Sequence, residues 1–214
     1  MQITEIFHSI QGESSRAGLP CTFVRLTACN LRCQWCDTTY SFYGGTKMTL
    51  EQIMQQIEYF GCRLVEITGG EPLLQQEVYA LMDYLLTEEY QVMLETSGER
   101  LLDRVPEKVF KIVDVKCPDS GAADTFNFDN IQYLNPHDEV KFVIASRRDY
   151  EFARTFTSSH RLCERVASVI FSPVHKAMAA DEMARWMLED KLQTPIRFGW
   201  QLHKSIWGPD TPGV

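Results

Sequence analysis

The chain has 214 residues, 44% of them hydrophobic, which is enough to bury a sizeable core in one domain. Lys and Arg number 21 against 29 Asp and Glu, and the net charge of −8 argues against binding to nucleic acid or anionic membranes. No run reaches the roughly 18 apolar residues of a transmembrane helix, and the start lacks the basic and apolar regions of a signal peptide. We therefore expect a cytoplasmic protein whose seven cysteines stay reduced.

Short β-rich runs alternate with helical runs along the chain. The sequence predicts strands at Ile3–Phe7, Thr22–Leu26, Leu64–Thr68, Gln91–Thr96, Lys111–Val115, Val140–Ile144, Ser168–Phe171 and Ile196–Leu202. Most of these runs are continuously apolar, as buried parallel strands are. Helices are predicted at Leu50–Phe60, Glu77–Glu88, Asp149–Thr157 and Asp181–Lys191. Thr49 and Gln52 form a capping box for the first helix, and Gly61 ends it.

Alternating strands and helices predict an α/β fold with parallel pairing, formed by residues 1–214 as a single domain. The sheet is expected to be either open and doubly wound or curled into a partial barrel, because a full eight-unit barrel needs about 250 residues. The segment Asp119–Asn135 is predicted to be irregular. The tail Trp207–Val214 has two prolines and two glycines, so we expect no helix there.

Three cysteines follow the second predicted strand in the spacing C-x3-C-x2-C: Cys29, Cys33 and Cys36. A cubic [4Fe-4S] cluster normally takes four cysteines, so three would leave one iron with an open position where chemistry can occur. The alternative is a zinc site whose fourth ligand is a distant residue such as histidine.

Polar and small residues also follow the other predicted strands. They are Thr68-Gly69-Gly70-Glu71-Pro72, Glu95-Thr96-Ser97-Gly98, Asp114-Val115-Lys116, Ser172-Pro173-Val174-His175 and Gln201-Leu202-His203-Lys204. Since parallel strands place their carboxyl ends at one edge of the sheet, these segments predict a common cavity. Each motif alone has a simpler reading as a turn.

The cysteine triplet and Gly69-Gly70-Glu71-Pro72, each after a strand, resemble the radical S-adenosylmethionine (SAM) superfamily. Ile10-Gln11-Gly12-Glu13, Phe23-Val24-Arg25-Leu26, Cys36-Asp37-Thr38, Asp114-Val115-Lys116 and Gln201-Leu202-His203-Lys204 resemble, within it, the 7-carboxy-7-deazaguanine synthase family. The resemblance implies a partial β/α barrel of about six parallel strands with an open side. It also implies a lyase that converts 6-carboxy-5,6,7,8-tetrahydropterin to 7-carboxy-7-deazaguanine with loss of ammonia, in queuosine biosynthesis.

The resemblance implies roles for individual residues. Cys29, Cys33 and Cys36 would bind the [4Fe-4S] cluster, and Thr38 would bind Mg²⁺. SAM would contact Trp35, Cys36, Asp37, Gly70, Asp114, Val115, Lys116, Ser172, Pro173, Val174 and His175. The pterin would contact Ile10, Gln11, Gly12, Arg25, Thr68 and the carboxylate of Val214. No further catalytic residue is assigned. An external electron donor such as flavodoxin and a homodimer are expected on the same ground.

Two substrate residues also have a physical rationale. Arg25 is a charged residue in an apolar strand, and either a substrate carboxylate or a protein acid would pair with it. The amide of Gln11 can match the donor–acceptor edge of a pterin, or it lies in a surface loop. His175 and His203 are candidates for acid–base chemistry, but we expect both to be packed, hydrogen-bonded residues.

Some family members carry a long insertion between the first two cysteines, and it forms one wall of the pocket. The short spacing here excludes such an insertion, and the sequence leaves open what replaces that wall. Two other functions share the cysteine motif. One is a glycyl-radical activase acting on a partner protein, and the other is a metal-stabilised binding module without enzymatic activity.

Overall fold

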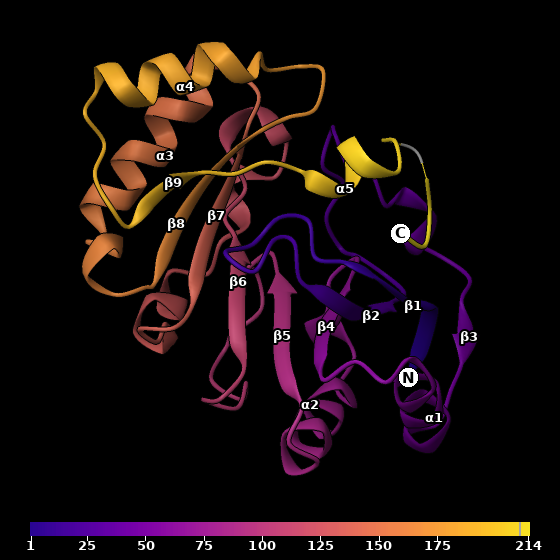
Figure 1. Cartoon of the computed structure of the whole chain (residues 1–214). Coiled ribbons are helices and arrows are strands. Elements are labelled where there is room, and N and C mark those ends of the chain that lie inside the picture. The colour runs from indigo at the N-terminus through magenta and orange to yellow at the C-terminus, as the bar shows by residue number, and fades with distance from the viewer. Residues whose placement is uncertain (210) are drawn as a thin grey trace.

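The computed structural model describes residues 1–209 and 211–214. Within them, nine strands form one sheet in the order β3-β1-β2-β4-β5-β6-β7-β8-β9 (Figure 1). The strands are β1 (Gln2–Ile10), β2 (Pro20–Leu26), β3 (Thr46–Lys47), β4 (Leu64–Gly69), β5 (Gln91–Thr96), β6 (Phe110–Asp114), β7 (Glu139–Ile144), β8 (Ser168–Pro173) and β9 (Ile196–Phe198). All the predicted strands are therefore present; β5 has the predicted bounds, and the ends of the others are shifted.

The sheet is mostly parallel and open. From β2 to β9 every neighbouring pair is parallel, which gives seven parallel strands in the described part of the chain, against the six or so expected. β1 is antiparallel to β2, and β3 is antiparallel to β1. β3 and β9 are the two ends of the strand order and do not pair with each other, so the barrel is partial, as predicted.

The helices are α1 (Leu50–Phe60), α2 (Val78–Thr87), α3 (Arg147–Ser159), α4 (Ala180–Glu189) and α5 (Leu202–Ile206). α1 begins at the predicted capping box of Thr49 and Gln52, and it ends at Gly61 with φ of 65°. The first four helices cover the outer face of the sheet, where α2 packs on β5 and α3 on β7 (Figure 1). None of the described helices is both long enough and apolar enough to span a membrane.

Two predicted segments differ in the structure. The strand predicted for Ile196–Leu202 ends at Phe198, because the Leu202 amide donates to Gly12 O (2.9 Å) and not to a strand, and Leu202 then begins α5. The irregular segment Asp119–Asn135 contains short 3-10 turns. The described residues of the tail Trp207–Val214 form no helix, as predicted, and residue 210 lies outside the described residues.

The inner face of the sheet has an apolar floor under a polar layer. Cys21, Leu64, Met93 and Ile112 form a buried cluster near the N-terminal ends of the strands. Toward the carboxyl ends the inward side chains include ionisable residues, among them Glu66 on β4 and Lys141 on β7. The alternation of side chains along a strand places Leu64, Glu66 and Thr68 on the same face.

The loop between β1 and β2 crosses this inner face (Figure 1). Its Ser15 amide donates to both carboxylate oxygens of Glu139 on β7, at 3.2 and 3.0 Å. The guanidinium of Arg16 stacks on Phe110 of β6, 3.7 Å from the ring centre. The loop therefore joins the two sides of the open barrel.

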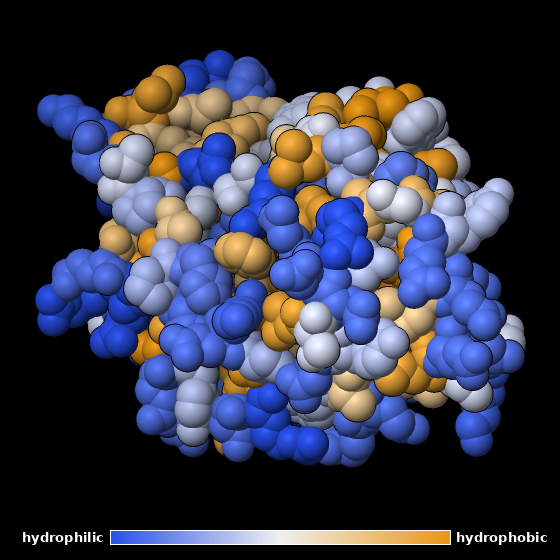
Figure 2. All heavy atoms as spheres, turned by 60° about the horizontal axis from the view of Figure 1, so that its bottom comes forward, coloured by the Kyte–Doolittle hydropathy of each residue, from blue (hydrophilic) through white to orange (hydrophobic). Residues whose placement is uncertain are grey.

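The N-terminal ends of the strands carry a separate hollow of about 450 Å³, lined by Leu19, Phe60, Cys62 and neighbouring residues. Figure 2, in which the lower end of Figure 1 comes forward, shows hydrophilic and hydrophobic side chains interspersed. This hollow lies at the end opposite the cysteine motif, since the motif follows the carboxyl end of β2.

Candidate functional site

The cysteine loop begins at a strained residue. Ala28, directly before Cys29, has φ of 84°, which a residue with a Cβ rarely adopts. Its amide donates to Ser41 O (2.8 Å), and its carbonyl accepts from the Glu71 amide (2.9 Å). The chain is thus held on both sides in a conformation that turns Cys29 away from the end of β2.

All three cysteines of the motif are free thiols that are half-buried in the loop after β2. Burial raises the pKa of Cys29 and of Cys33. In the part of the chain that the structure describes, no three His, Cys, Asp or Glu residues are grouped for a single metal ion. Three thiols in one short loop suit a cluster, which spreads its ligands over separate irons, better than a mononuclear zinc site.

Arg32, inside the cysteine loop, is held by that loop and by the segment that follows it. Its Nη1 donates to Cys29 O (2.7 Å) and Leu31 O (2.6 Å), and its guanidinium stacks on Phe42, 4.2 Å from the ring centre. Its Nη2 donates to the hydroxyl of Tyr43 (3.1 Å). Phe42 and Tyr43 therefore lie beside the short loop, where some family members have an insertion.

Gly70 permits the β4 turn to touch the cysteine loop. A Cβ on Gly70 would lie 2.3 Å from Ala28 O and 2.5 Å from the Cβ of Cys29, closer than real contacts allow. Glu71 is buried and accepts from the Leu73 amide (3.1 Å), Thr96 Oγ1 (2.8 Å) and the Ser97 amide (2.9 Å). Gly-Gly-Glu-Pro is therefore a turn that joins β4, β5 and the cysteine loop.

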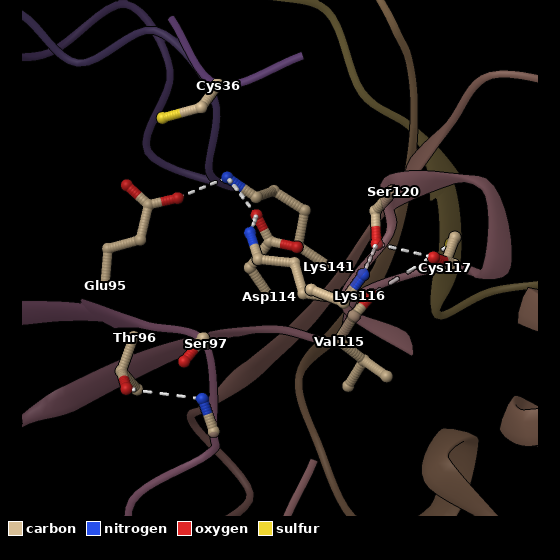
Figure 3. A network of polar contacts seen from close by, with 12 residues as sticks. Cys36, Glu95, Thr96, Ser97, Asp114, Val115, Lys116, Cys117, Ser120 and Lys141 are labelled. Atoms are coloured by element: carbon tan, nitrogen blue, oxygen red, sulfur yellow. Dashed lines mark hydrogen bonds and ion pairs between the residues drawn. The ribbon is translucent and has the colours of Figure 1, made fainter. Parts of the chain in front are cut away.

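A charge network centred on Lys141 occupies the inner face at the carboxyl ends of β5, β6 and β7. The Lys141 ammonium pairs with Glu13 Oε2 (2.7 Å), with Glu95, and with Asp114 Oδ2 (3.6 Å). Figure 3 shows Lys141 reaching between Glu95 and Asp114, with the thiol of Cys36 above them. Burial by itself would lower the pKa of Lys141, but the three carboxylates hold it well above its ordinary value.

Glu66 and Gln11 form the deepest polar pair of this network. Gln11 Nε2 donates to Glu66 Oε2 (3.0 Å), while Gln11 Oε1 accepts from the Glu13 and Ser14 amides at 2.9 and 3.0 Å. Burial, with a contribution from Glu95, raises the pKa of Glu66 to about 8. The amide oxygen of Gln11 is thus engaged within the protein, and its second N–H bonds to none of the described residues.

Arg25 pairs with a protein acid in this structure, the alternative that the sequence left open. Its Nε donates to Glu5 Oε1 (2.7 Å), which also accepts from the Tyr40 hydroxyl (2.8 Å). Burial and Glu5 raise the pKa of Tyr40 to about 12. Thr68 of β4 is in register with Arg25 of β2, so their side chains share the inner face. Among the described residues, the terminal N–H groups of Arg25 have no hydrogen-bond partner.

The C-terminal segment folds back over the β1–β2 loop. Lys204 Nζ pairs with Asp37 Oδ2 (2.6 Å), and Gln201 Nε2 donates to Glu13 Oε1 (2.7 Å). The ring of His203 packs against Gly12, where a Cβ on Gly12 would lie only 2.4 Å from His203 Nδ1. A Cβ on Gly213 would lie 3.7 Å from Glu5 Oε2, so the residue before Val214 lies near the partner of Arg25.

The remaining residues predicted for SAM lie at the carboxyl ends of β6 and β8. Lys116 Nζ pairs with Asp114 Oδ2 (2.9 Å), and the other oxygen of Asp114 is buried with no partner within the described residues. Ser172 and Pro173 are the last residues of β8, followed by Val174 and His175. Ile10 differs from the other predicted residues, because it pairs with Pro20 at the N-terminal end of β2.

Sequence reasoning missed several charged residues of the site. They are Glu13, Glu66, Glu95, Lys141 and Lys204. Glu66 and Lys141 are charged residues within apolar strands, the same signal that identified Arg25. Glu13 and Lys204 stood within recognised motifs but were given no role.

Residues 24–177 match the family model of the radical SAM superfamily. A 7-carboxy-7-deazaguanine synthase of Koribacter versatilis is 53% identical, with both chains fully covered. One of Chlorobaculum tepidum is 43% identical over 100% of this chain and 97% of its own. This chain belongs to the 7-carboxy-7-deazaguanine synthase family. The fold of this synthase family member is similar to the crystal structure of QueE from Escherichia coli. The TM-score is 0.76, at 23% sequence identity over 94% of each chain.

The three cysteines and their surroundings fit the [4Fe-4S] cluster and SAM that membership of the superfamily implies. The donor set consists of thiols, and Gly70 leaves room for the close approach of two loops. Asp114 Oδ1 is buried, and none of the residues that the structure describes bonds to it. The polar inner face lies directly beside this loop, as a small polar substrate would require.

Proposed function

We propose that this protein converts 6-carboxy-5,6,7,8-tetrahydropterin to 7-carboxy-7-deazaguanine with loss of ammonia, as a radical SAM lyase of queuosine biosynthesis. The main support is the 53% identity over the whole chain to the synthase of Koribacter versatilis. The joining of the cysteine loop to a polar inner face, through Gly70 and Glu71, supports the same reaction.

The proposed cofactor site lies in the cysteine loop. Cys29, Cys33 and Cys36 would hold the cluster, while Trp35 to Asp37, Gly70, Asp114 to Lys116 and Ser172 to His175 would bind SAM. When bound, these groups supply an electron and a radical that abstracts hydrogen from substrate. Arg32 holds the loop in shape, since it donates to two of its carbonyl groups.

The proposed pterin site lies on the inner face. Arg25 would bind the substrate carboxylate, and Thr68 and the second N–H of Gln11 would bind the ring. Gly12, Ile10 and the Val214 carboxylate complete the set that we propose. Lys141 pairs with the carboxylates of Glu13 and Glu95 and balances their charge, so substrate would meet an organised polar surface.

Five further features belong to this proposal. Mg²⁺ would bind at Thr38, whose Oγ1 is 3.7 Å from the sulfur of Cys36. An external donor such as flavodoxin would reduce the cluster. The enzyme would be a cytoplasmic homodimer, with residues 1–214 forming one domain in each subunit.

The test is anaerobic turnover of reconstituted protein with the carboxypterin, SAM, dithionite and Mg²⁺. We expect 7-carboxy-7-deazaguanine and ammonia in equal amounts. A protein with an intact cluster that makes no deazaguanine would contradict the function. A stable radical on a partner protein would instead favour the glycyl-radical activase, and a colourless zinc protein would favour the binding module.

A further inference from the structure

The C-terminal latch, Gln201–Trp207, contacts both halves of the proposed site. On one side it touches the β1–β2 loop, where the Leu202 amide donates to Gly12 O (2.9 Å) and Gln201 Nε2 donates to Glu13 Oε1 (2.7 Å). On the other side Lys204 pairs with Asp37, the residue after Cys36. Figure 1 shows α5 lying beside the loop that follows β1, although the two are far apart in sequence.

The latch is held by polar contacts and not by an apolar core. α5 has five residues, and its two apolar ones, Leu202 and Ile206, lie outside the buried core. A helix this short is unstable without tertiary contacts. Its position therefore depends on Glu13, Gly12 and Asp37, and a change at either proposed binding site is transmitted to it.

A continuous path of hydrogen bonds crosses the latch. Glu13 is ionised: burial by itself would raise its pKa, but the charge of Lys141 beside it holds that pKa well below its ordinary value. The carboxylate orients Gln201 so that Nε2 faces Glu13 and Oε1 accepts from Lys204 (3.0 Å). Lys204 then pairs with Asp37 at 2.6 Å.

The Lys204–Asp37 pair is shielded from water on its Lys204 side. The Lys204 side chain is only 9% exposed, against 42% for Asp37, so water screens the Lys204 charge poorly. Asp37 lies in the segment that we propose for SAM, and Glu13 follows the segment that we propose for the pterin. Lys204 and Gln201 are the side chains that join them.

We infer that Lys204 is a positioning residue that couples the two ligands: by holding Asp37 to the latch, it makes binding of the pterin at the Gln11–Glu13 loop tighten binding of SAM at the cysteine loop. This inference rests on the proposed function, because it needs both ligands. Coupling of this kind is reciprocal, so bound SAM should increase the affinity for the pterin by the same factor.

The experiment measures SAM affinity on anaerobically reconstituted protein whose cluster stays oxidised, so that no turnover occurs. Equilibrium dialysis gives the Kd for SAM with and without saturating carboxypterin. In the unmodified protein we expect saturating pterin to lower the Kd for SAM by about fivefold or more, within the usual range of such coupling. In Lys204→Met the factor falls below about twofold, at unchanged iron content per chain.

Three variants separate positioning from general damage. Lys204→Arg keeps a cation with several donors, and it should retain most of the coupling. Asp37→Asn should lose the coupling to the same extent as Lys204→Met, and combining the two should add little. Lys108→Met, an exposed lysine before β6 at the opposite end of the strands, is the matched control and should couple like the unmodified protein.

Three results would overturn the inference. The first is an unmodified protein that forms product but whose SAM affinity does not change with pterin. The second is a Lys204→Met variant that keeps the coupling of the unmodified protein. The third is a Lys204→Met variant that loses SAM affinity equally with and without pterin. A protein that neither binds the pterin nor forms product would instead contradict the proposed function. If Lys204→Met fails to hold iron, Asp37→Asn and Lys204→Arg still decide the question.

Discussion

Gly70 shows how one missing side chain positions the cysteine loop. Because its φ is ordinary, its requirement is for space: a Cβ would meet Ala28 O at 2.3 Å and Cys29 Cβ at 2.5 Å. Ala28 in turn has φ of 84° and is held by Ser41 and Glu71. The approach of the β4 turn to the cluster loop thus depends on two residues that have no side-chain chemistry.

We predict that Gly70→Ala weakens SAM binding at least about tenfold, which equals 1.4 kcal/mol, because backbone atoms of the loop must shift. Equilibrium dialysis on reconstituted protein measures this. Gly61→Ala is the control: nothing lies within 4 Å of its Cβ, so it should cost about 1 kcal/mol of stability through its φ of 65° alone and leave SAM binding unchanged. Equal SAM affinity in both variants would show that Gly70 has no such role.

Arg25 combines a protein partner with free N–H groups. We predict that Arg25→Ala raises the Kd for the carboxypterin by about tenfold or more, since a charge-assisted hydrogen bond contributes about 1.5–3 kcal/mol. SAM affinity should change less than twofold or so. Glu5→Gln serves as the comparison, because it removes the charge of the partner and keeps the guanidinium. If Arg25→Ala weakens both ligands equally, Arg25 is structural.

At the scale of elements, Glu71 joins three of them. It follows β4 and accepts hydrogen bonds from Leu73 in the next turn and from Thr96 and Ser97 at the end of β5. Pro72 after it is the first residue of a 3-10 turn, a position that suits its fixed φ. The Gly-Gly-Glu-Pro motif therefore holds the carboxyl ends of β4 and β5 together.

Glu71→Ala should lower the free energy of unfolding by about 3 kcal/mol, since it leaves several buried donors unpaired at about 1–3 kcal/mol each. Urea unfolding of the apoprotein measures this. Glu51→Ala, at the exposed first turn of α1, should cost less than about 0.5 kcal/mol. A Glu71→Ala variant as stable as this control would contradict the role of Glu71 in joining the strands.

At the scale of the whole molecule, the charges of the inner face set a pH dependence. The pKa of Glu66 is raised to about 8 by burial and by Glu95, against an unfolded value of 4.5. Between these values the folded state binds more protons than the unfolded state, so this group destabilises the fold progressively as pH rises from about 4.5 to about 8. Above about pH 8 its effect is constant.

Glu66→Gln should remove this dependence, because the amide mimics the protonated acid and can still accept from Gln11. We compare the free energy of unfolding of the variant with that of the unmodified protein at pH 5 and at pH 8. From pH 5 to pH 8 this difference should shift in favour of the variant by more than about 1.4 kcal/mol, the equivalent of one pKa unit. Urea unfolding at the two pH values measures it. Parallel stability curves would show that Glu66 does not titrate in this range.

The sequence by itself determined the kind of fold, because apolar runs and helical spacing are local properties. It placed β5 and α1 at their observed residues, and it identified the cysteine loop and the Gly-Gly-Glu-Pro turn at strand ends. Family membership then followed from the same motifs. The cofactor chemistry rests on short segments, which a sequence displays directly.

Only the tertiary structure decided which polar residues meet. Lys141, Glu13, Glu95 and Asp114 meet from four separate segments. Lys204 reaches Asp37 from α5, of which only the first residue, Leu202, fell within a predicted strand. It also showed that Gln11 and Arg25 already have protein partners. Ion pairs between distant segments depend on register and loop paths, and these are set by packing of the whole sheet, not by local spacing.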